Sequence, residues 1–109
     1  MKAEIVFADE KLGQAFDRLK DSKTEERQLY DLLKRAFEDI ENNPSGFIHV
    51  PKNLIPGEYK RKYGIDNLWK YDLPNGWRLL YSLSKEKVLL IAIILEWMDH
   101  KNYERRFKY

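Results

Sequence analysis

The run Val88–Trp97, with the sequence VLLIAIILEW, constrains the fold of this chain more than any other segment. Alternate side chains of a strand point to opposite faces of a sheet, and here both sets are largely apolar. The heavier set is expected to face helices and consists of Leu89, Ile91, Ile93, Leu95 and Trp97. The second set is expected on the opposite face and consists of Val88, Leu90, Ala92, Ile94 and Glu96. Such a strand belongs inside a sheet that is covered on both faces.

Two amphipathic helices are predicted in the N-terminal half. The first covers Glu10–Lys20, with Asp9 as its N-terminal cap. The second follows a cap at Ser22 or Thr24 and ends at Asn42-Asn43-Pro44, because the residue before a proline disfavours helix. Apolar residues recur at helical spacing in both, at Leu12, Ala15, Phe16 and Leu19 and at Leu29, Leu32, Leu33, Ala36, Phe37 and Ile40. Both helices therefore have one apolar face that needs a sheet.

Three more strands are predicted, at Glu4–Phe7, Leu68–Leu73 and Trp77–Leu83. The connection Pro74-Asn75-Gly76 suits a three-residue hairpin loop, a type I turn followed by a left-handed glycine. This register makes an apolar face from the opposed pairs Leu73 and Trp77, Tyr71 and Leu79, and Trp69 and Tyr81. The other face then holds Lys70, Asp72, Arg78 and Ser82, with Leu68 and Leu80. A one-residue shift would mix tryptophan with lysine, so we prefer this register.

These elements predict a single α+β domain over residues 1–109, with an N-terminal helical hairpin packed on a small antiparallel sheet that ends in a C-terminal β-meander. Gly46–Gly64 is expected to be a loop region, with a short edge segment at Phe47–Val50. Two helices can cover only one face of the sheet. We therefore expect this loop region, the C-terminal tail or a partner protein to cover the other face.

Composition narrows the classes of protein. The chain has no cysteine, which excludes disulfides and thiolate metal sites, and its two histidines do not suggest zinc. The longest apolar run, Val88–Leu95, is far shorter than the ~20 residues of a membrane helix. The N-terminus becomes charged before a signal-peptide hydrophobic region could form. We therefore expect a cytoplasmic protein with no membrane association.

Charge is distributed unevenly along the chain. Residues 1–50 carry 8 Lys and Arg against 11 Asp and Glu, a net charge of −3, whereas residues 51–109 carry 12 against 7, a net charge of +5. A basic half favours an anionic partner, with nucleic acid as the first candidate. Ordinary surface charge is the alternative interpretation.

Basic and aromatic residues gather near the predicted polar face and after the last strand. Arg78 lies on a middle strand, and Lys60-Arg61-Lys62 precede the first hairpin. His100 and Tyr103 follow the last strand in the segment DHKNYERRFKY. No Gly-rich phosphate loop, HExxH or GxSxG motif is present. These residue types suit RNA cleavage by the 2′-hydroxyl, which needs a base, an acid and cations for the phosphorane, and no metal or other cofactor.

The order helix–helix–hairpin–long strand, the strand GWRLLYSL and the ending HKNYERRFKY resemble the RelE/ParE toxin superfamily over nearly the whole chain. The resemblance implies a RelE/YoeB-like toxin that cleaves mRNA on the ribosome and that a cognate antitoxin neutralises. It also implies catalytic roles for Arg78, His100 and Tyr103. Residues of the type that binds RNA are Lys60, Arg61, Lys62, Lys70, Arg105 and Arg106.

Two other functions remain open on the same fold, a ParE-like inhibitor of DNA gyrase that is not an enzyme and a catalytically silent module that binds RNA or protein. Structural roles are also open for the candidate residues. Arg78 could form a cross-strand ion pair with Asp72, His100 could be a surface residue, and Tyr103 could pack on the end of the sheet. Glu96 could face solvent or polarise His100.

Overall fold

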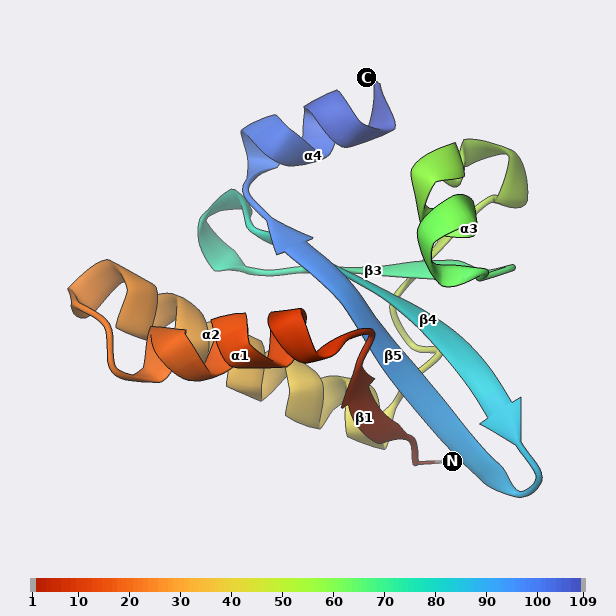
Figure 1. The fold of residues 1–109 in the computed structure, drawn as a ribbon, viewed down its shortest axis with the longest axis horizontal. Helices are drawn as coiled ribbons and strands as arrows, with labels where there is room; N and C mark the ends of the chain where they lie inside the picture. Colours follow the sequence, from red (N-terminus) through yellow and green to blue (C-terminus); the bar gives the residue numbers. More distant parts are fainter. Residues whose placement is uncertain (1, 109) are drawn as a thin grey trace.

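The structure, a computed structural model that describes residues 2–108, has the expected α+β fold (Figure 1). One five-stranded sheet has the strand order β1-β5-β4-β3-β2. Its strands are β1 (Glu4–Phe7), β2 (Ile48–Val50), β3 (Leu68–Asp72), β4 (Arg78–Glu86) and β5 (Leu89–Met98). The helices are α1 (Glu10–Lys20), α2 (Thr24–Asn42), α3 (Gly57–Tyr63) and α4 (His100–Phe107), with 3-10 turns η1 (Lys52–Leu54) and η2 (Pro74–Gly76).

The helical hairpin follows its sequence pattern closely. The Asp9 carboxylate caps α1 by accepting a hydrogen bond from the Leu12 amide at 2.8 Å. The cap predicted for the second helix is wrong, because Lys23 holds that position without a side-chain bond and Thr24 is already helical. The apolar stripe of α2 is buried against the sheet at Leu29, Tyr30, Leu33, Ala36, Phe37 and Ile40.

The hairpin between β3 and β4 has the predicted register, with Trp69 opposite Tyr81 and Asp72 opposite Arg78. Its turn differs from the prediction. Both Asn75, at φ 64°, and Gly76, at φ 79°, are left-handed, whereas a type I turn would place only the glycine there. Asparagine tolerates this region better than most residues, so the loop length and the register are unaffected.

A β-bulge changes which side chains of β5 face the helical hairpin. Leu80 is opposite Glu96 and Tyr81 is opposite Ile94, so Leu95 is the extra residue on β5. The alternation therefore reverses, and the prediction for the N-terminal part of this strand is wrong. Leu90, Ala92 and Ile94 join the core under α1 and α2, whereas Ile93 and Leu95 pack on the opposite face. Trp97 and Glu96, beyond the bulge, lie on the faces predicted for them.

The sheet is not purely antiparallel, since β1 joins its edge beside β5 in parallel orientation. The strand itself was predicted at the observed position, but its partner was not. Ile5 lies opposite Ala92 and Phe7 opposite Ile94, which gives the apolar β5 a neighbour on its second edge.

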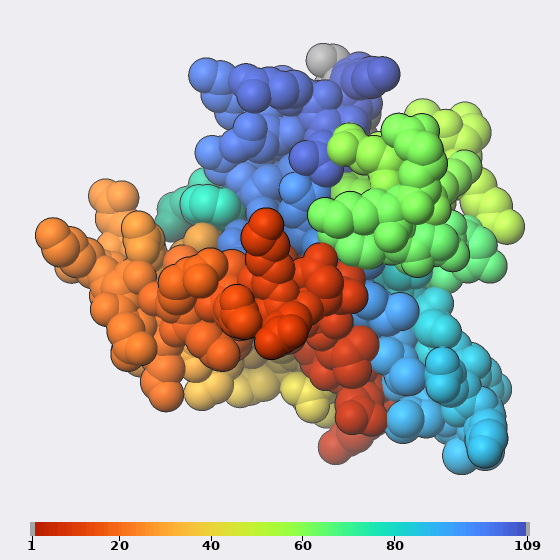
Figure 2. Space-filling view, in the orientation of Figure 1, coloured from red at the N-terminus to blue at the C-terminus, as the bar shows by residue number. Residues whose placement is uncertain are grey.

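Much of the second face of the sheet is covered by the chain itself. The region predicted as a loop contains α3, which follows Pro56 and is capped after Tyr63 by the left-handed Gly64, at φ 64°. The C-terminal tail forms α4, which Figure 1 shows following the carboxyl end of β5, and α3 contacts β5 through Tyr59 and Tyr63. The hydrophobic core between these two helices and the sheet consists of Val50, Ile55, Tyr59, Leu68, Leu80, Leu95, Met98 and Tyr103. The space-filling view shows α1 and α2 on one side and α3 and α4 on another, with the β4–β5 hairpin projecting beyond them (Figure 2).

Three tyrosines should resist ionisation in the folded protein. Burial, then a hydrogen bond to Asp39, raises the pKa of Tyr71 from 10.0 to about 12. Burial also raises the pKa of Tyr81 and, together with a bond to Glu96, that of Tyr59. A raised folded-state pKa means that this contribution to stability is complete below pH ~10 and is lost as pH rises through the folded value.

We expect tyrosinate absorbance at about pH 11 to be lower in the native protein than in denaturant, where tyrosines ionise near pH ~10. Tyr71→Phe should remove one of the late-titrating groups. Equal absorbance of native and denatured protein at that pH would contradict the expectation.

Candidate functional site

A cluster of charged side chains lies where β3, β4 and α4 meet. Lys70 and Asp72 point to the same face of β3, and Arg78 opens β4 opposite Asp72. Arg78 is also opposite Met98 at the end of β5, so the helix that follows β5 begins beside it. This helix is α4, which starts at His100 and lies in the C-terminal tail, for which no helix was predicted.

The guanidinium group of Arg78 lies close to three neighbouring polar groups. Its Nη2 lies 3.4 Å from Nδ1 of His100, and its Nη1 donates a hydrogen bond to the Trp77 carbonyl at 3.1 Å. Its Nε lies 3.1 Å from Oδ1 of Asp72, an ion pair whose geometry is too poor for a hydrogen bond. The side chain is 18% exposed. The cross-strand ion pair and the convergence with His100 therefore exist together.

The ring of Tyr103 packs against two cations of the cluster, Lys70 and Arg78. Its ring lies 5.0 Å from the Lys70 ammonium and 5.6 Å from the Arg78 guanidinium carbon, within the range of cation–π attraction. Tyr103 is only 4% exposed and packs with Phe107. Lys70 also lies 3.4 Å from Asp72. The buried ring thus supports both cations from below, while Asp72 contacts them from a more exposed position.

His100 lies between Arg78 and Glu104. Its Nε2 contacts the Glu104 carboxylate one turn along α4, and its Cβ packs beside Gly76 in the β3–β4 turn. Nδ1 facing an arginine donor and Nε2 facing a carboxylate fit a neutral imidazole with its proton on Nε2. Glu104 was not among the site residues predicted from the sequence. Its i, i+4 spacing from His100 would have identified it had the tail been predicted as a helix.

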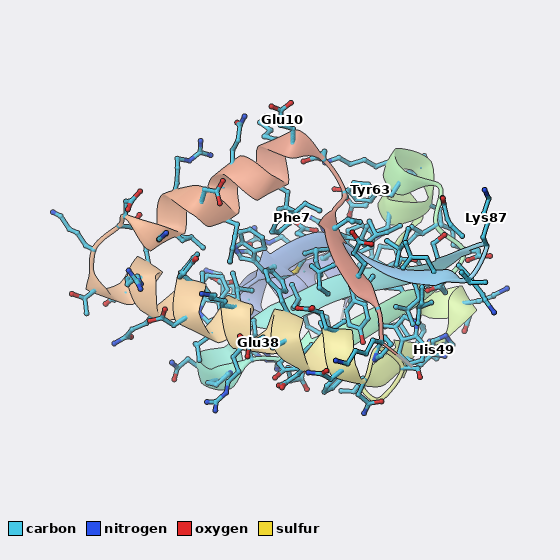
Figure 3. All side chains as sticks on the ribbon, turned by 90° about the horizontal axis from the view of Figure 1, so that it is seen from below. Phe7, Glu10, Glu38, His49, Tyr63 and Lys87 are labelled. Carbon is cyan, nitrogen blue, oxygen red and sulfur yellow. The ribbon has the colours of Figure 1, made fainter. Side chains whose placement is uncertain are left out.

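The other candidate cations are placed elsewhere. Lys60, Arg61 and Lys62 are exposed on α3, an element that contributes none of the contacts described above. Lys62 lies 5.2 Å from the ring of Tyr63, which Figure 3 labels beside α3, and a hydrogen bond to this tyrosine raises the pKa of Lys62. Arg105 is exposed on α4.

Arg106 has a structural partner set. It lies 2.7 Å from Glu96 and 3.0 Å from Glu58, and its guanidinium carbon is 5.5 Å from the ring of Tyr59. Glu96 also accepts a hydrogen bond from the Tyr59 hydroxyl at 2.6 Å. The network ties α4 to α3 and β5. Glu96 therefore binds Arg106 and Tyr59, and neither of the roles considered for it, facing solvent or polarising His100, describes these contacts.

A separate groove of about 750 Å³ lies between the helical hairpin and the β3–β4 turn. Its apolar lining includes Leu19, Leu29, Trp77 and Trp97, with Arg18, Glu25 and Glu26 also along it. Within residues 2–108, no group of three or more His, Cys, Asp or Glu side chains could hold a metal ion. No helix in the described part of the chain is long and apolar enough to cross a membrane.

The cluster of Lys70, Asp72, Arg78, His100 and Tyr103 can bind a phosphate group and move a proton. A guanidinium and an ammonium group can stabilise developing negative charge, and a neutral histidine can accept a proton. The His100 side chain is 59% exposed and Asp72 is 46% exposed, so the cluster opens to solvent on this side. Comparison of the chain with protein-family models, with curated proteins and with solved structures found no match.

Proposed function

We propose that this protein is a metal-independent endoribonuclease of the RelE/ParE toxin kind, which cleaves mRNA on the ribosome. The observation that carries the proposal is the meeting of Arg78 and His100 at 3.4 Å, above Tyr103 and beside Lys70. These residues come from β3, β4 and α4, and together they offer a candidate base and the cations for cleavage of an RNA phosphodiester, with water as the acid.

In this mechanism the substrate phosphate takes the Arg78 donor that now faces His100, which frees Nδ1 of the imidazole. Nδ1 accepts the 2′-hydroxyl proton as the 2′-oxygen attacks phosphorus. Arg78 and Lys70 stabilise the added charge on the phosphorane oxygens. The bond to the 5′-oxygen breaks, this oxygen takes a proton from water, and the products are a 2′,3′-cyclic phosphate and a 5′-hydroxyl end. Tyr103 acts by holding the two cations, because its ring is buried beneath them.

The partner proposed with this activity is a small antitoxin. An apolar second sheet face was one reason to expect it, but α3 and α4 already cover much of that face. The antitoxin therefore remains part of the proposal through the family resemblance, and we assign no surface to it.

Induced expression in bacteria tests the proposal directly. We expect growth arrest together with cleaved reporter mRNA whose new downstream fragments carry 5′-hydroxyl ends. Such ends accept phosphate from polynucleotide kinase without prior phosphatase treatment, which separates this chemistry from hydrolysis that leaves a 5′-phosphate. Growth arrest with intact mRNA and altered DNA supercoiling would contradict the nuclease proposal and indicate an inhibitor of DNA gyrase.

A protein-binding module is the second candidate, and the groove that contains Trp77 and Trp97 favours it. Aromatic side chains beside a hollow are common in binding sites. A folded protein that neither arrests growth nor cleaves RNA would support this candidate over the enzyme.

A further inference from the structure

The Asp72 carboxylate lies against both cations of the cluster. Its Oδ1 is 3.4 Å from the Lys70 ammonium and 3.1 Å from Nε of Arg78. The sheet sets this arrangement, because Lys70 and Asp72 are two residues apart on β3 and Arg78 is directly opposite Asp72. Asp72 therefore occupies a position that an oxygen of a phosphate would need in order to contact both cations.

The exposures of the three side chains differ in a way that suits displacement. Lys70 and Arg78 are 16% and 18% exposed, whereas Asp72 is 46% exposed. The cations are thus held inside the protein and the carboxylate lies toward solvent. One carboxylate against two cations leaves a net positive charge, and Nε of Arg78 is buried without an aligned hydrogen-bond acceptor. Asp72 therefore neutralises only part of the positive charge of Lys70 and Arg78, and it leaves Nε of Arg78 without a hydrogen bond.

We propose that Asp72 is a specificity-determining residue, a tethered anion that competes with phosphate for Lys70 and Arg78. A free phosphate must displace the carboxylate with no other gain, so it binds poorly. A polynucleotide gains further contacts along its backbone and can displace it. The inference rests on the proposed function and specifies its substrate class, a phosphodiester within a polymer. Selectivity of this kind arises from repulsion of the wrong ligand.

The test compares wild type with Asp72→Asn in binding of inorganic phosphate and of an uncleavable 2′-deoxy oligonucleotide, at constant ionic strength. We expect Asp72→Asn to bind inorganic phosphate at least about tenfold more tightly, since a like charge is removed from the site. The affinity for the oligonucleotide should rise by a smaller factor. Asp31→Asn is the control, because it removes a carboxylate from the exposed pair with Arg27 on α2.

Unchanged or weaker phosphate binding by folded Asp72→Asn would overturn the inference and make Asp72 a structural support for Arg78. Circular dichroism checks the fold, and Asp72→Ser decides the question if the asparagine variant does not fold. Phosphate binding is measured without RNA cleavage. A gain in Asp72→Asn from a protein that cleaves no mRNA would therefore support the role of Asp72 while rejecting the nuclease.

Discussion

Arg78→Ala is expected to reduce mRNA cleavage at least ~100-fold and to abolish growth arrest on induced expression, because loss of one preorganised donor to a developing oxyanion typically costs ~10²–10³ in rate. In the proposed mechanism Arg78 stabilises the phosphorane and also sets the position of His100, with which it lies in contact. Cleavage is measured from the yield of fragments with new 5′-hydroxyl ends at matched protein levels.

The fold should survive this substitution. Arg78 lies at the first position of β4, and its partner Asp72 is nearly half exposed, so their ion pair contributes little to stability. Arg78→Lys keeps the charge but loses the planar fork that binds two phosphate oxygens, and we expect an intermediate loss. Lys87→Asn is the matched control for the loss of one positive charge, since Lys87 lies in the turn between β4 and β5, far from Arg78 (Figure 3). Its backbone is left-handed, a conformation that asparagine accepts. Undiminished mRNA cleavage by the Arg78→Ala variant would show that Arg78 is not a catalytic residue.

Leu80→Ala should destabilise the protein by ~2–5 kcal/mol, the usual cost of truncating a fully buried leucine. Leu80 is 0% exposed, and its side chain lies in the core that α3 and α4 cover. This loss is a large part of the ~5–15 kcal/mol by which a domain of this kind is stable. The midpoint of urea unfolding measures it.

Leu79→Ala provides the matched comparison. Leu79 is the neighbouring residue of β4, is also 0% exposed and faces the core beneath α1 and α2. We expect similar losses for the two variants, since each side chain is enclosed by the chain's own helices. A loss below ~1 kcal/mol for Leu80→Ala alone would mean that α3 and α4 do not close this face in solution.

Local chemistry was sufficient to predict several elements. Asp9 caps a helix because its carboxylate reaches an amide three residues along the chain, and α2 buries the stripe that its period of 3.6 residues aligns. The pairing of β3 with β4 was predictable as well. A short loop and the alternation of apolar residues left one register that separates tryptophan from lysine.

The candidate site was predictable only in part. Arg78, His100 and Tyr103 do lie together, but Tyr103 is a buried floor and Arg106 is held by Glu58 and Glu96. These environments come from α4, whose eight residues have too few apolar positions to reveal a helix from periodicity. Short helices depend on tertiary packing for their stability.

The sequence by itself determined the α+β class, the helical hairpin and the β3–β4 register, because each depends on contacts between residues close along the chain. Only the tertiary structure decided the faces of β5, the parallel partner of β1 and the contact of His100 with Arg78. The bulge at Leu95 reverses an alternation that is apolar in either phase, so no local signal could distinguish the two. Tertiary packing resolves that ambiguity by burying Leu95 with Leu80 beneath α3 and α4, and Ala92 and Ile94 beneath the helical hairpin.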